Sequence, residues 1–427
     1  MPEIHAELLS DAAVGALPVA SFTRGTLRYI PGSVLRGAVA TRYLAAGNGL
    51  DATFTAAFEG AVRWGALYVR DEPPQPLSWW VHKYERKSDC PKYYDDARGD
   101  VPPNHTCANC DSPLEPSKGA ISGVGTKVDT HVKLVNGTAS EGNLFARERI
   151  VHRLSGGNLT FSGRVDPLSS AGEAALQEVW TSVAGGQQSA AEVWFGGRRS
   201  TNGGRARLRI VDQAPAALAP NGGNLTIRLT SPGIFVDDYG RPSASPRVDE
   251  LTATLGVEVS VNRSWFRWAA EGGWHAASKL PKPVERVVAA GSVYEFTVSA
   301  PPHPDALSKL AVRGLGLRKA EGFGAVAPMP VATVDIHQLR QQIVCLRSLG
   351  SKLKTAVIQE MTKAQQMMQA GRQPQWTITA KLTDPPPALR KAEPTMSKLW
   401  AQACQLIIAV DDPDVMLALI DYLRSAK

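Results

Sequence analysis

The sequence predicts an α+β protein with two related domains in tandem, a small cysteine-containing insert and a helical C-terminal extension. Glycine-rich basic loops occur once in each half of the chain, at 195–210 and at 312–326. Each half also opens on a strand-like stretch, over residues 3–15 and 225–236. After Asp335, apolar residues recur at helical spacing instead. A length of 427 residues suits two or three domains.

A proline- and glycine-rich segment at 215–224 is the best interdomain linker. We therefore expect a first domain over 1–214, a second over 215–335 and a helical extension over 336–427. The apolar stripe of the extension is most simply a core or a contact with a partner protein.

A helix is predicted to start within YIPGSVLRG, residues 29–37. Pro31, Gly32 and Ser33 form a start signal, with Ser33 as the N-cap or a first-turn residue. Arg36 lies in the first turn, where a basic side chain opposes the helix dipole. Its presence favours an anion bound at this helix end. The alternative is that Arg36 simply extends into solvent.

The polar insert over about 78–120 contains a candidate metal site. Cys107-Ala-Asn-Cys110 has the spacing that directs two thiolates at one zinc ion. Cys90 is the third candidate, and His105 and His82 are the candidates for the fourth. A structural staple is expected, because so small an insert lacks its own core. A site that has lost its metal is the alternative. The predicted zinc ligands are Cys90, Cys107, Cys110 and His105.

The rest of the first domain mixes strands with one helix. Asn136-Gly137 is a hairpin signal between two strand-like runs. An amphipathic helix is expected over 172–185. Residues 124–135 carry Asp129 and His131, two groups able to act in acid–base chemistry.

The basic loop and strand that follow are the strongest functional signal. Two glycine pairs, Gly196–Gly197 and Gly203–Gly204, bracket Arg198 and Arg199. Glycine allows positive φ and close approach of another chain. Alternating arginines then predict a strand with one apolar and one guanidinium face, which suits phosphate oxygens. The arginines of this strand are Arg205, Arg207 and Arg209.

The second domain repeats part of this pattern. A two-stranded excursion over 257–300 is rich in aromatics, which either stack bases or, as we expect, form hairpin and interface core. A short helix is expected over 305–313. The second glycine-rich loop then carries Arg318, Lys319 and Phe323. The aromatics of the excursion are Trp265, Phe266, Trp268 and Trp274.

Composition permits a nucleic-acid partner and excludes several other classes. The formal charge is +7 and the sequence pI about 9.1, and the clustering of arginines matters more than the total. No run of about 18 apolar residues is present, so no membrane span is expected. The N-terminus has no signal-peptide pattern, and we expect a cytoplasmic protein. G-x-S-x-G, H-E-x-x-H, P-loop and G-x-G-x-x-G motifs are absent.

Taken together, these stretches resemble the RAMP superfamily of CRISPR effector proteins, most closely the two-domain RAMP subunit of type III-D complexes. The resemblance covers roughly residues 1–335. It is carried by YIPGSVLRG (29–37), NGTASEGNLFARERI (136–150), FGGRRSTNGGRARL (195–208), LTIRLTSPGIFVDDYGRP (225–242), GWHAASKLPKPVERVVAAGSVYEF (273–296) and GLGLRKAEGFGAV (314–326).

The resemblance implies two tandem ferredoxin-like (RRM-like) βαββαβ domains in a ribonucleoprotein of antiviral defence. It implies binding of CRISPR RNA (crRNA) at its 5′ repeat handle, contacts with other RAMP subunits and the large polymerase-like subunit, and only indirect contact with target RNA. We expect a non-catalytic subunit. The expected RNA-binding residues are Ser33, Arg36, Gly196, Gly197, Arg198, Arg199, Gly203, Gly204, Arg205, Arg207, Arg318, Lys319 and Phe323.

The alternative is a RAMP endoribonuclease that processes precursor crRNA or cleaves target RNA. Some branches of the superfamily cut RNA with a His or with an Asp on a loop. Asp129 or His131 would fill that role here.

Overall fold

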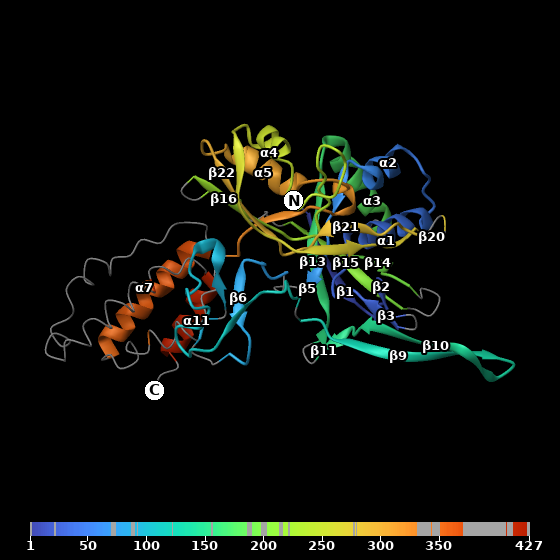
Figure 1. Cartoon of the computed structure of the whole chain (residues 1–427), viewed down its shortest axis with the longest axis horizontal. Coiled ribbons are helices and arrows are strands. Elements are labelled where there is room, and N and C mark those ends of the chain that lie inside the picture. The colour runs from blue at the N-terminus through green and yellow to red at the C-terminus, as the bar shows by residue number, and fades with distance from the viewer. Residues whose placement is uncertain are drawn as a thin grey trace. The chain divides into compact units, whose positions relative to one another are not determined.

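The computed structural model describes residues 2–20, 23–69, 74–86, 90–91, 93–121, 123–154, 157–185, 190–197, 203–212, 217–220, 223–275, 278, 280–330, 343, 351–369, 407 and 413–424 (Figure 1). The chain divides into two compact units. The first comprises Met1–Trp79, Asp96–Gly99 and Pro116–Met329, and the second comprises Trp80–Asp95, Asp100–Glu115 and Pro330–Lys427. The first unit combines several helices with largely antiparallel sheets, which confirms the predicted α+β class.

The elements as far as the predicted linker are β1 (Pro2–Leu8), β2 (Gly15–Ala20), β3 (Thr23–Thr26), α1 (Gly32–Ala45), α2 (Ala52–Glu59), β4 (Val62–Trp64), β5 (Tyr68–Val69), β6 (Trp79–His82), β7 (Tyr94–Asp95), η1 (Asp96–Arg98), β8 (Leu114–Pro116), β9 (Thr126–Val135), β10 (Thr138–Ile150), β11 (Arg153–Leu154), β12 (Gly157–Asn158), β13 (Thr160–Pro167), α3 (Ser170–Ala184), β14 (Ala190–Trp194) and β15 (Arg205–Asp212).

The elements after it are β16 (Asn224–Leu229), α4 (Val248–Leu255), β17 (Val259–Trp265), β18 (Trp268–Glu271), β19 (Trp274–His275), β20 (Leu280–Pro281), β21 (Glu285–Val288), β22 (Val293–Val298), α5 (Pro304–Arg313), η3 (Lys319–Glu321), β23 (Val326–Pro328), α7 (Ser351–Gln369) and α11 (Pro413–Arg424).

The first half of the unit is built on a sheet with the strand order β14-β15-β1-β13-β4, and β5 pairs beside β13. All of these pairs are antiparallel. The helix α1 follows β1, and α3 follows β13. Ile4, Phe161 and Leu208 from the strands share one core with Leu35 of α1 and Val179 of α3, so the helices cover one face of the sheet. Ser169 caps α3 by accepting a hydrogen bond from the Gly172 N–H.

A long two-stranded arm, β9 and β10, projects from this half beside β2 and β3 (Figure 1). Asn136 and Gly137 join its strands with φ values of 50° and 79°. Both residues therefore have positive φ, as a two-residue type I′ turn requires, so the hairpin predicted from Asn-Gly is present.

The second half has its own sheet, with the strand order β17-β22-β16-β23, and its own core. Ile227 and Phe296 of the sheet pack with Leu251 of α4 and Leu310 of α5. In both halves the first strand of the sheet therefore lies between the strand before the second helix and a strand after it, and the first half has β14 as an additional edge strand.

The second compact unit contains the cysteine insert and the C-terminal segment. The insert forms a three-stranded sheet, β7-β6-β8, around a core of only Cys90, Tyr94, Cys107 and Leu114. In the C-terminal segment, α7 and α11 agree with the predicted helices and bury Met361 and Met416 completely. The rest of 336–427, apart from residues 343 and 407, lies outside the described residues.

Candidate nucleic-acid interface and metal cluster

The strand β15 carries the predicted arginine face. Ala206 and Leu208 are fully buried beneath the helices, so the alternating arginines lie on the opposite face of the sheet. Arg209 is exposed and lies opposite His5 of β1 and Ala190 of β14. Among the described residues, none forms an ion pair with Arg209.

The other two arginines of β15 form ion pairs across the sheet. Arg205 binds both carboxylate oxygens of Glu192, with distances of 3.0 Å from Nε and from Nη2. Arg207 Nη1 lies 3.4 Å from Glu7 Oε2. The side chains of both pairs are about a third exposed or more. Ion pairs this exposed contribute only about 0–1 kcal/mol, so a phosphate can compete with the carboxylates.

The glycine-rich loop before β15 packs closely on the turn that follows β1. Gly196 and Gly204 have φ values of 72° and 75°. A Cβ at Gly196 would lie 2.0 Å from the Ala13 carbonyl oxygen, and one at Gly204 would lie 2.0 Å from that of Phe195. These two glycines are thus required by the chain's own packing, whereas a Cβ at Gly197 would meet nothing within 4 Å. Arg198 and Arg199 lie outside the described residues.

Asp11 ties this loop to the base of the arm. Its carbonyl accepts the Gly204 N–H at 2.9 Å, and its carboxylate lies 2.6 Å from Lys127 Nζ and 2.7 Å from His152 Nδ1. Burial opposes ionisation of Asp11, but the hydrogen bonds from His152 and Lys127 outweigh it and lower the pKa of Asp11 to about 2. Asp11 therefore connects the loop to Lys127 and His152 through a hydrogen bond and ion pairs that the sequence did not predict.

The helix α1 begins within the predicted stretch. It starts at Gly32 after Pro31 and no side chain caps it, so Ser33 is a first-turn residue, one of the two places predicted for it, and not the N-cap. Arg36 Nη1 donates to the Phe58 carbonyl at 2.6 Å, and its Nη2 lies 3.9 Å from Glu321 Oε2. The anion beside Arg36 is thus a carboxylate of the second half of the chain.

The second glycine-rich loop forms a contact between the two halves. A Cβ at Gly322 would lie 2.2 Å from the Trp64 carbonyl oxygen and 3.2 Å from the Gly32 Cα. Arg318 donates to both oxygens of Glu321 at 2.9 Å. The structure therefore brings the loop together with the start of α1.

The remaining predicted groups of this loop are also engaged within the chain. Lys319 Nζ is paired with Glu250, and Arg318 lies over the Phe323 ring, 5.0 Å from its centroid. These cations are paired because the second half of the chain places the acidic side chains of Glu250 and Glu321 beside the loop. The sequence of the first glycine-rich loop gives no indication of such partners. Arg318, Lys319 and Phe323 stabilise this packing and are less available to RNA than Arg209.

The root of the insert, Asp96 and Ala97, contacts the second sheet at its edge strand β17. Trp265 Nε1 donates to Asp96 Oδ2 at 2.8 Å, and Arg263 donates to the Asp96 and Ala97 carbonyls. Arg228 is buried and donates to the Pro74 and Pro328 carbonyls. Arg263 is exposed as well, but it is paired with Glu295, whereas Arg209 of the first sheet has no ion-pair partner among the described residues.

Asp129 and His131 are neighbours on one face of the arm, but each has a structural partner. Asp129 is paired with Arg149, and His131 stacks on Phe145 with 5.2 Å between ring centroids. An ion-paired carboxylate is a poor general base, because the cation stabilises its charged form.

The insert brings three cysteines and one histidine to a common point. One donor atom from each of His82, Cys90, Cys107 and Cys110 lies within 4.8 Å of all the others, and Cys110 Sγ is 3.6 Å from His82 Nε2. His105, the predicted fourth ligand, is not in this cluster: it is exposed and stacks on Trp80 with 4.3 Å between ring centroids. The cluster can bind a metal, and its histidine is the alternative candidate, His82.

Hydrogen bonds and burial act in opposite directions on the thiols of this cluster. The Asn109 N–H and the Tyr94 hydroxyl each donate to Cys107 Sγ at 3.4 Å. Hydrogen bonds from Ser112 lower the pKa of Cys110 to about 6, whereas burial raises the pKa of Cys90 to about 12.

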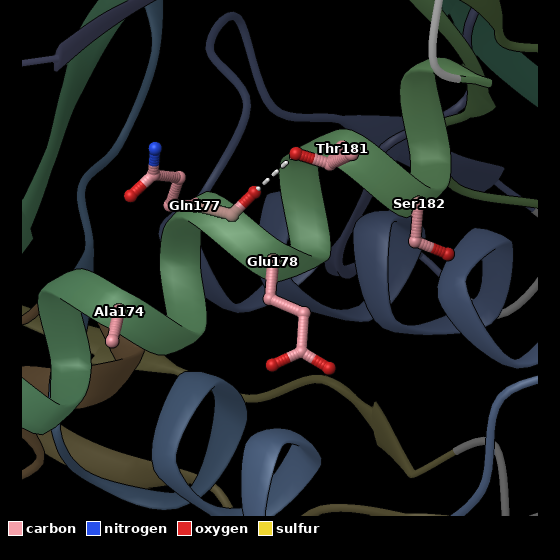
Figure 2. Close-up of a pocket in the computed structure, with 5 residues that line it drawn as sticks. All are labelled: Ala174, Gln177, Glu178, Thr181 and Ser182. Atoms are coloured by element: carbon pink, nitrogen blue, oxygen red, sulfur yellow. Dashed lines mark hydrogen bonds between the residues drawn. The ribbon is translucent and has the colours of Figure 1, made fainter.

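The outer face of α3 offers a shallow hollow that lacks catalytic groups. It is lined by Ala174, Gln177, Glu178, Thr181 and Ser182 (Figure 2). Thr181 Oγ1 donates to the Gln177 carbonyl at 2.9 Å, and Glu178 accepts from Thr53. Its single charged group is thus already hydrogen-bonded.

None of the helices in the described ranges has the length and hydropathy needed to span a membrane.

Comparison with known proteins identifies the family. The family model described as CRISPR-associated protein (Cas_Cmr3) matches residues 98–327, more than half of the chain. The molecule is therefore a RAMP-superfamily subunit of a type III CRISPR effector, as the sequence resemblance implied. The chain belongs to the Cas_Cmr3 family of CRISPR-associated proteins. No curated protein matches the sequence.

Solved structures resemble the chain only distantly. A chain of a type III-B Cmr-beta complex bound to cognate target RNA and AMPPnP gives a TM-score of 0.38 at 11% identity, over 69% of this chain and 86% of that one. A Csm3–Csm4 subcomplex of a type III-A complex gives 0.36 at 12%, over 70% and 98%. A RAMP protein binding different RNA substrates gives 0.31 at 11%, over 77% and 98%. At these scores the likeness does not extend to function.

Proposed function

We propose that this chain is the crRNA-binding structural subunit of its effector complex and that it holds the RNA backbone along the arginine face of β15. The observation that supports this most directly is Arg209, an exposed arginine without an ion-pair partner in the described chain, next to the weakly paired Arg207. Arginine binds phosphate bidentately and remains charged at all physiological pH values.

The topology supports this choice of face. In this proposal the strands β15-β1-β13-β4 with α1 and α3 form a ferredoxin-like βαββαβ domain to which β14 adds an edge strand, and β23-β16-β22-β17 with α4 and α5 form the second such domain. In RRM proteins, which share this architecture, RNA lies on the open face of the sheet. Here that face of the first sheet carries Arg209 without an ion-pair partner in the described chain and the weakly paired Arg207, whereas Arg263 of the second sheet is paired with the buried Glu295.

In this proposal the bound RNA is the 5′ repeat handle, and the subunit contacts other RAMP subunits and the large polymerase-like subunit. Target RNA is reached only indirectly, and RNA is held without being cleaved. The helical C-terminal extension docks on a partner protein. Membership of the Cas_Cmr3 family supports assembly with other subunits, and the basic pI of about 9.1 supports the RNA.

The test is a salt titration of RNA binding by the Arg207→Gln/Arg209→Gln variant. For single-stranded RNA, the loss of two phosphate contacts should reduce the slope of log K against log salt by about 1.4. Fluorescence anisotropy with a labelled single-stranded RNA measures both the affinity and the slope. The matched control is Arg318→Gln/Lys319→Gln, which removes two cations already paired with Glu321 and Glu250.

The control should keep the slope of the wild type. An unchanged slope in the β15 variant would remove this face from the RNA site. A reduced slope in the control alone would move the site to the second glycine-rich loop.

In the same proposal, the cluster of the insert binds a structural zinc ion. Tetrahedral zinc with sulfur at about 2.3 Å separates its ligands by about 3.8 Å. The donors of His82, Cys90, Cys107 and Cys110 are close to that spacing. Among its described residues the insert has a small core of four buried side chains with three partly buried ones packed against them, so a metal would supply much of its folding energy.

Metal analysis tests this part. The wild type should carry about one zinc per chain, as one four-ligand site requires. His82→Ala should lose zinc, whereas His105→Ala should retain it, because His105 contacts Trp80 instead. Equal zinc in the two variants would contradict the ligand assignment, and a wild type without zinc would contradict the site.

A further inference from the structure

We propose that Phe266, Trp268 and Arg286 form a stacking platform for an unpaired RNA base, with Arg267 placed beside it for the phosphate. This inference rests on the proposed function and names the part of the RNA that the second half of the chain would bind.

The platform is built on the hairpin of β18 and β21. Ala270 pairs with Arg286 and Trp268 with Val288, so Trp268 and Arg286 share one face of the hairpin. The Arg286 guanidinium carbon lies 4.0 Å from the centroid of the Trp268 ring. Phe266 meets the same indole edge-on, at 5.9 Å and 86°. Two aromatic rings and one guanidinium plane thus form a continuous group.

The hairpin that carries this group is held in place by contacts with the rest of the chain. Trp268 is partly buried and packs against the core of the second half. On the other face of the hairpin, Glu271 accepts a hydrogen bond of 3.1 Å from the Tyr29 hydroxyl. The hairpin is therefore held from both sides, and a base stacked on it would require little reordering of the protein.

The outer surface of the group is exposed and cationic. Phe266 is 39% exposed, and Arg267 and Arg286 are both exposed. No carboxylate of the described chain forms an ion pair with either arginine, whereas Arg263, Arg247 and Arg318 of the same half all have such partners. This surface complements a polyanion.

The chemistry favours an RNA base as the occupant. A guanidinium is planar and weakly hydrated, so its outer face accepts a base while its inner face stays on an aromatic ring. Every base has a π face, and stacking on such a platform tolerates any sequence. We expected these aromatics to be hairpin core; that interpretation holds for Trp265, which binds Asp96, but not for Phe266.

The test compares RNA binding by the 427-residue chain and its Phe266→Ala and Arg286→Ala variants, using a fluorescein-labelled single-stranded RNA of mixed sequence. Each variant should bind about tenfold more weakly, the typical loss for one stacked base. The matched control is Arg241→Ala. Arg241 also lies over an aromatic ring, that of Tyr239 at 4.9 Å, but its charge is paired with Asp237. This variant should bind like the wild type.

An abasic RNA of the same length separates stacking from charge. On this probe, Phe266→Ala should lose its disadvantage, because there is no base to stack. Equal losses on both probes, or wild-type affinity of Phe266→Ala on the first, would overturn the platform.

The outcomes also separate this inference from the proposed function. If Arg207→Gln/Arg209→Gln weakens binding while Phe266→Ala and Arg286→Ala do not, the platform fails and the arginine face stands. A wild type that binds no RNA would overturn both. If Phe266→Ala binds RNA normally but fails to join the assembled effector, the surface is a protein contact and the platform is wrong.

Discussion

Substitution of Gly32 by alanine should disrupt the contact between the two halves of the first unit. A Cβ at Gly32 would lie 1.8 Å from the Trp64 carbonyl oxygen and 2.7 Å from that of Glu321. Both atoms belong to the backbone and cannot rotate away. The start of α1 must therefore shift, and overpacking of this kind costs about 1–3 kcal/mol.

Gly37 in the same helix is the matched control. It is exposed, and a Cβ there would meet nothing within 4 Å. Alanine in a helix interior is favoured over glycine by about 0.5–1 kcal/mol, so Gly37→Ala should stabilise the protein. The two variants should therefore differ by roughly 1.5–4 kcal/mol, the sum of the two effects.

Urea denaturation followed by far-UV circular dichroism measures this difference. Gly32→Ala should unfold at lower urea than the wild type, and Gly37→Ala at slightly higher urea. Equal midpoints for the two variants would refute the close packing of α1, β4 and the second glycine-rich loop.

Two further predictions concern charged groups in the same region. Burial opposes ionisation of Glu321, but hydrogen bonds from Arg318 and Lys282 lower the pKa of Glu321 from 4.5 to about 2. The ionised Glu321 side chain therefore stabilises the folded protein fully above pH 4.5, and this stabilisation is lost as the pH falls through about 2. Glu321→Gln should be less stable than the wild type at neutral pH, with a gap that closes toward pH 2 in thermal melts; a constant gap would contradict the ion pairs. Arg63 and Asp166 form a buried pair at 2.8 Å, and Asp166 is also paired with the partly exposed Arg164. Arg63→Met leaves the buried carboxylate with one of its two cations and should cost about 3 kcal/mol. The Arg63→Met/Asp166→Leu variant should cost less, and chemical denaturation showing the reverse order would count against a buried carboxylate that needs both cations.

Much of the fold is predictable from local sequence. The alternation of Arg205, Arg207 and Arg209 with buried residues is a period-two signal that depends only on one strand having one buried face. The turn at Asn136-Gly137 is equally local, because both residues tolerate positive φ. The resemblance to RAMP proteins supplied the tandem organisation, which periodicity does not determine.

The partners of the charged residues were not predictable, because they come from distant parts of the sequence. Glu321 is almost 300 residues away from Arg36, and Glu250 is far from Lys319, so the sequence shows unpaired cations where the structure shows ion pairs. The sequence therefore predicted an anion beside Arg36 without indicating that it belongs to the chain.

The choice of histidine in the metal cluster failed for a similar reason. His105 lies two residues before Cys107, but it adopts a φ of 53° and turns onto Trp80. His82 is brought to the cysteines by β6, the central strand of the small sheet. Proximity in sequence is a weak guide where the chain turns sharply. The sequence named His82 as a candidate but gave no reason to prefer it to His105.

The most direct test of the central claim is an arginine-selective footprint of the chain with and without single-stranded RNA. Phenylglyoxal modification read by mass spectrometry reports the accessibility of each guanidinium group. We predict that RNA protects Arg207 and Arg209, while Arg318 changes little because Glu321 and Glu285 already hold it. Unchanged modification of Arg207 and Arg209 at saturating RNA would contradict the account.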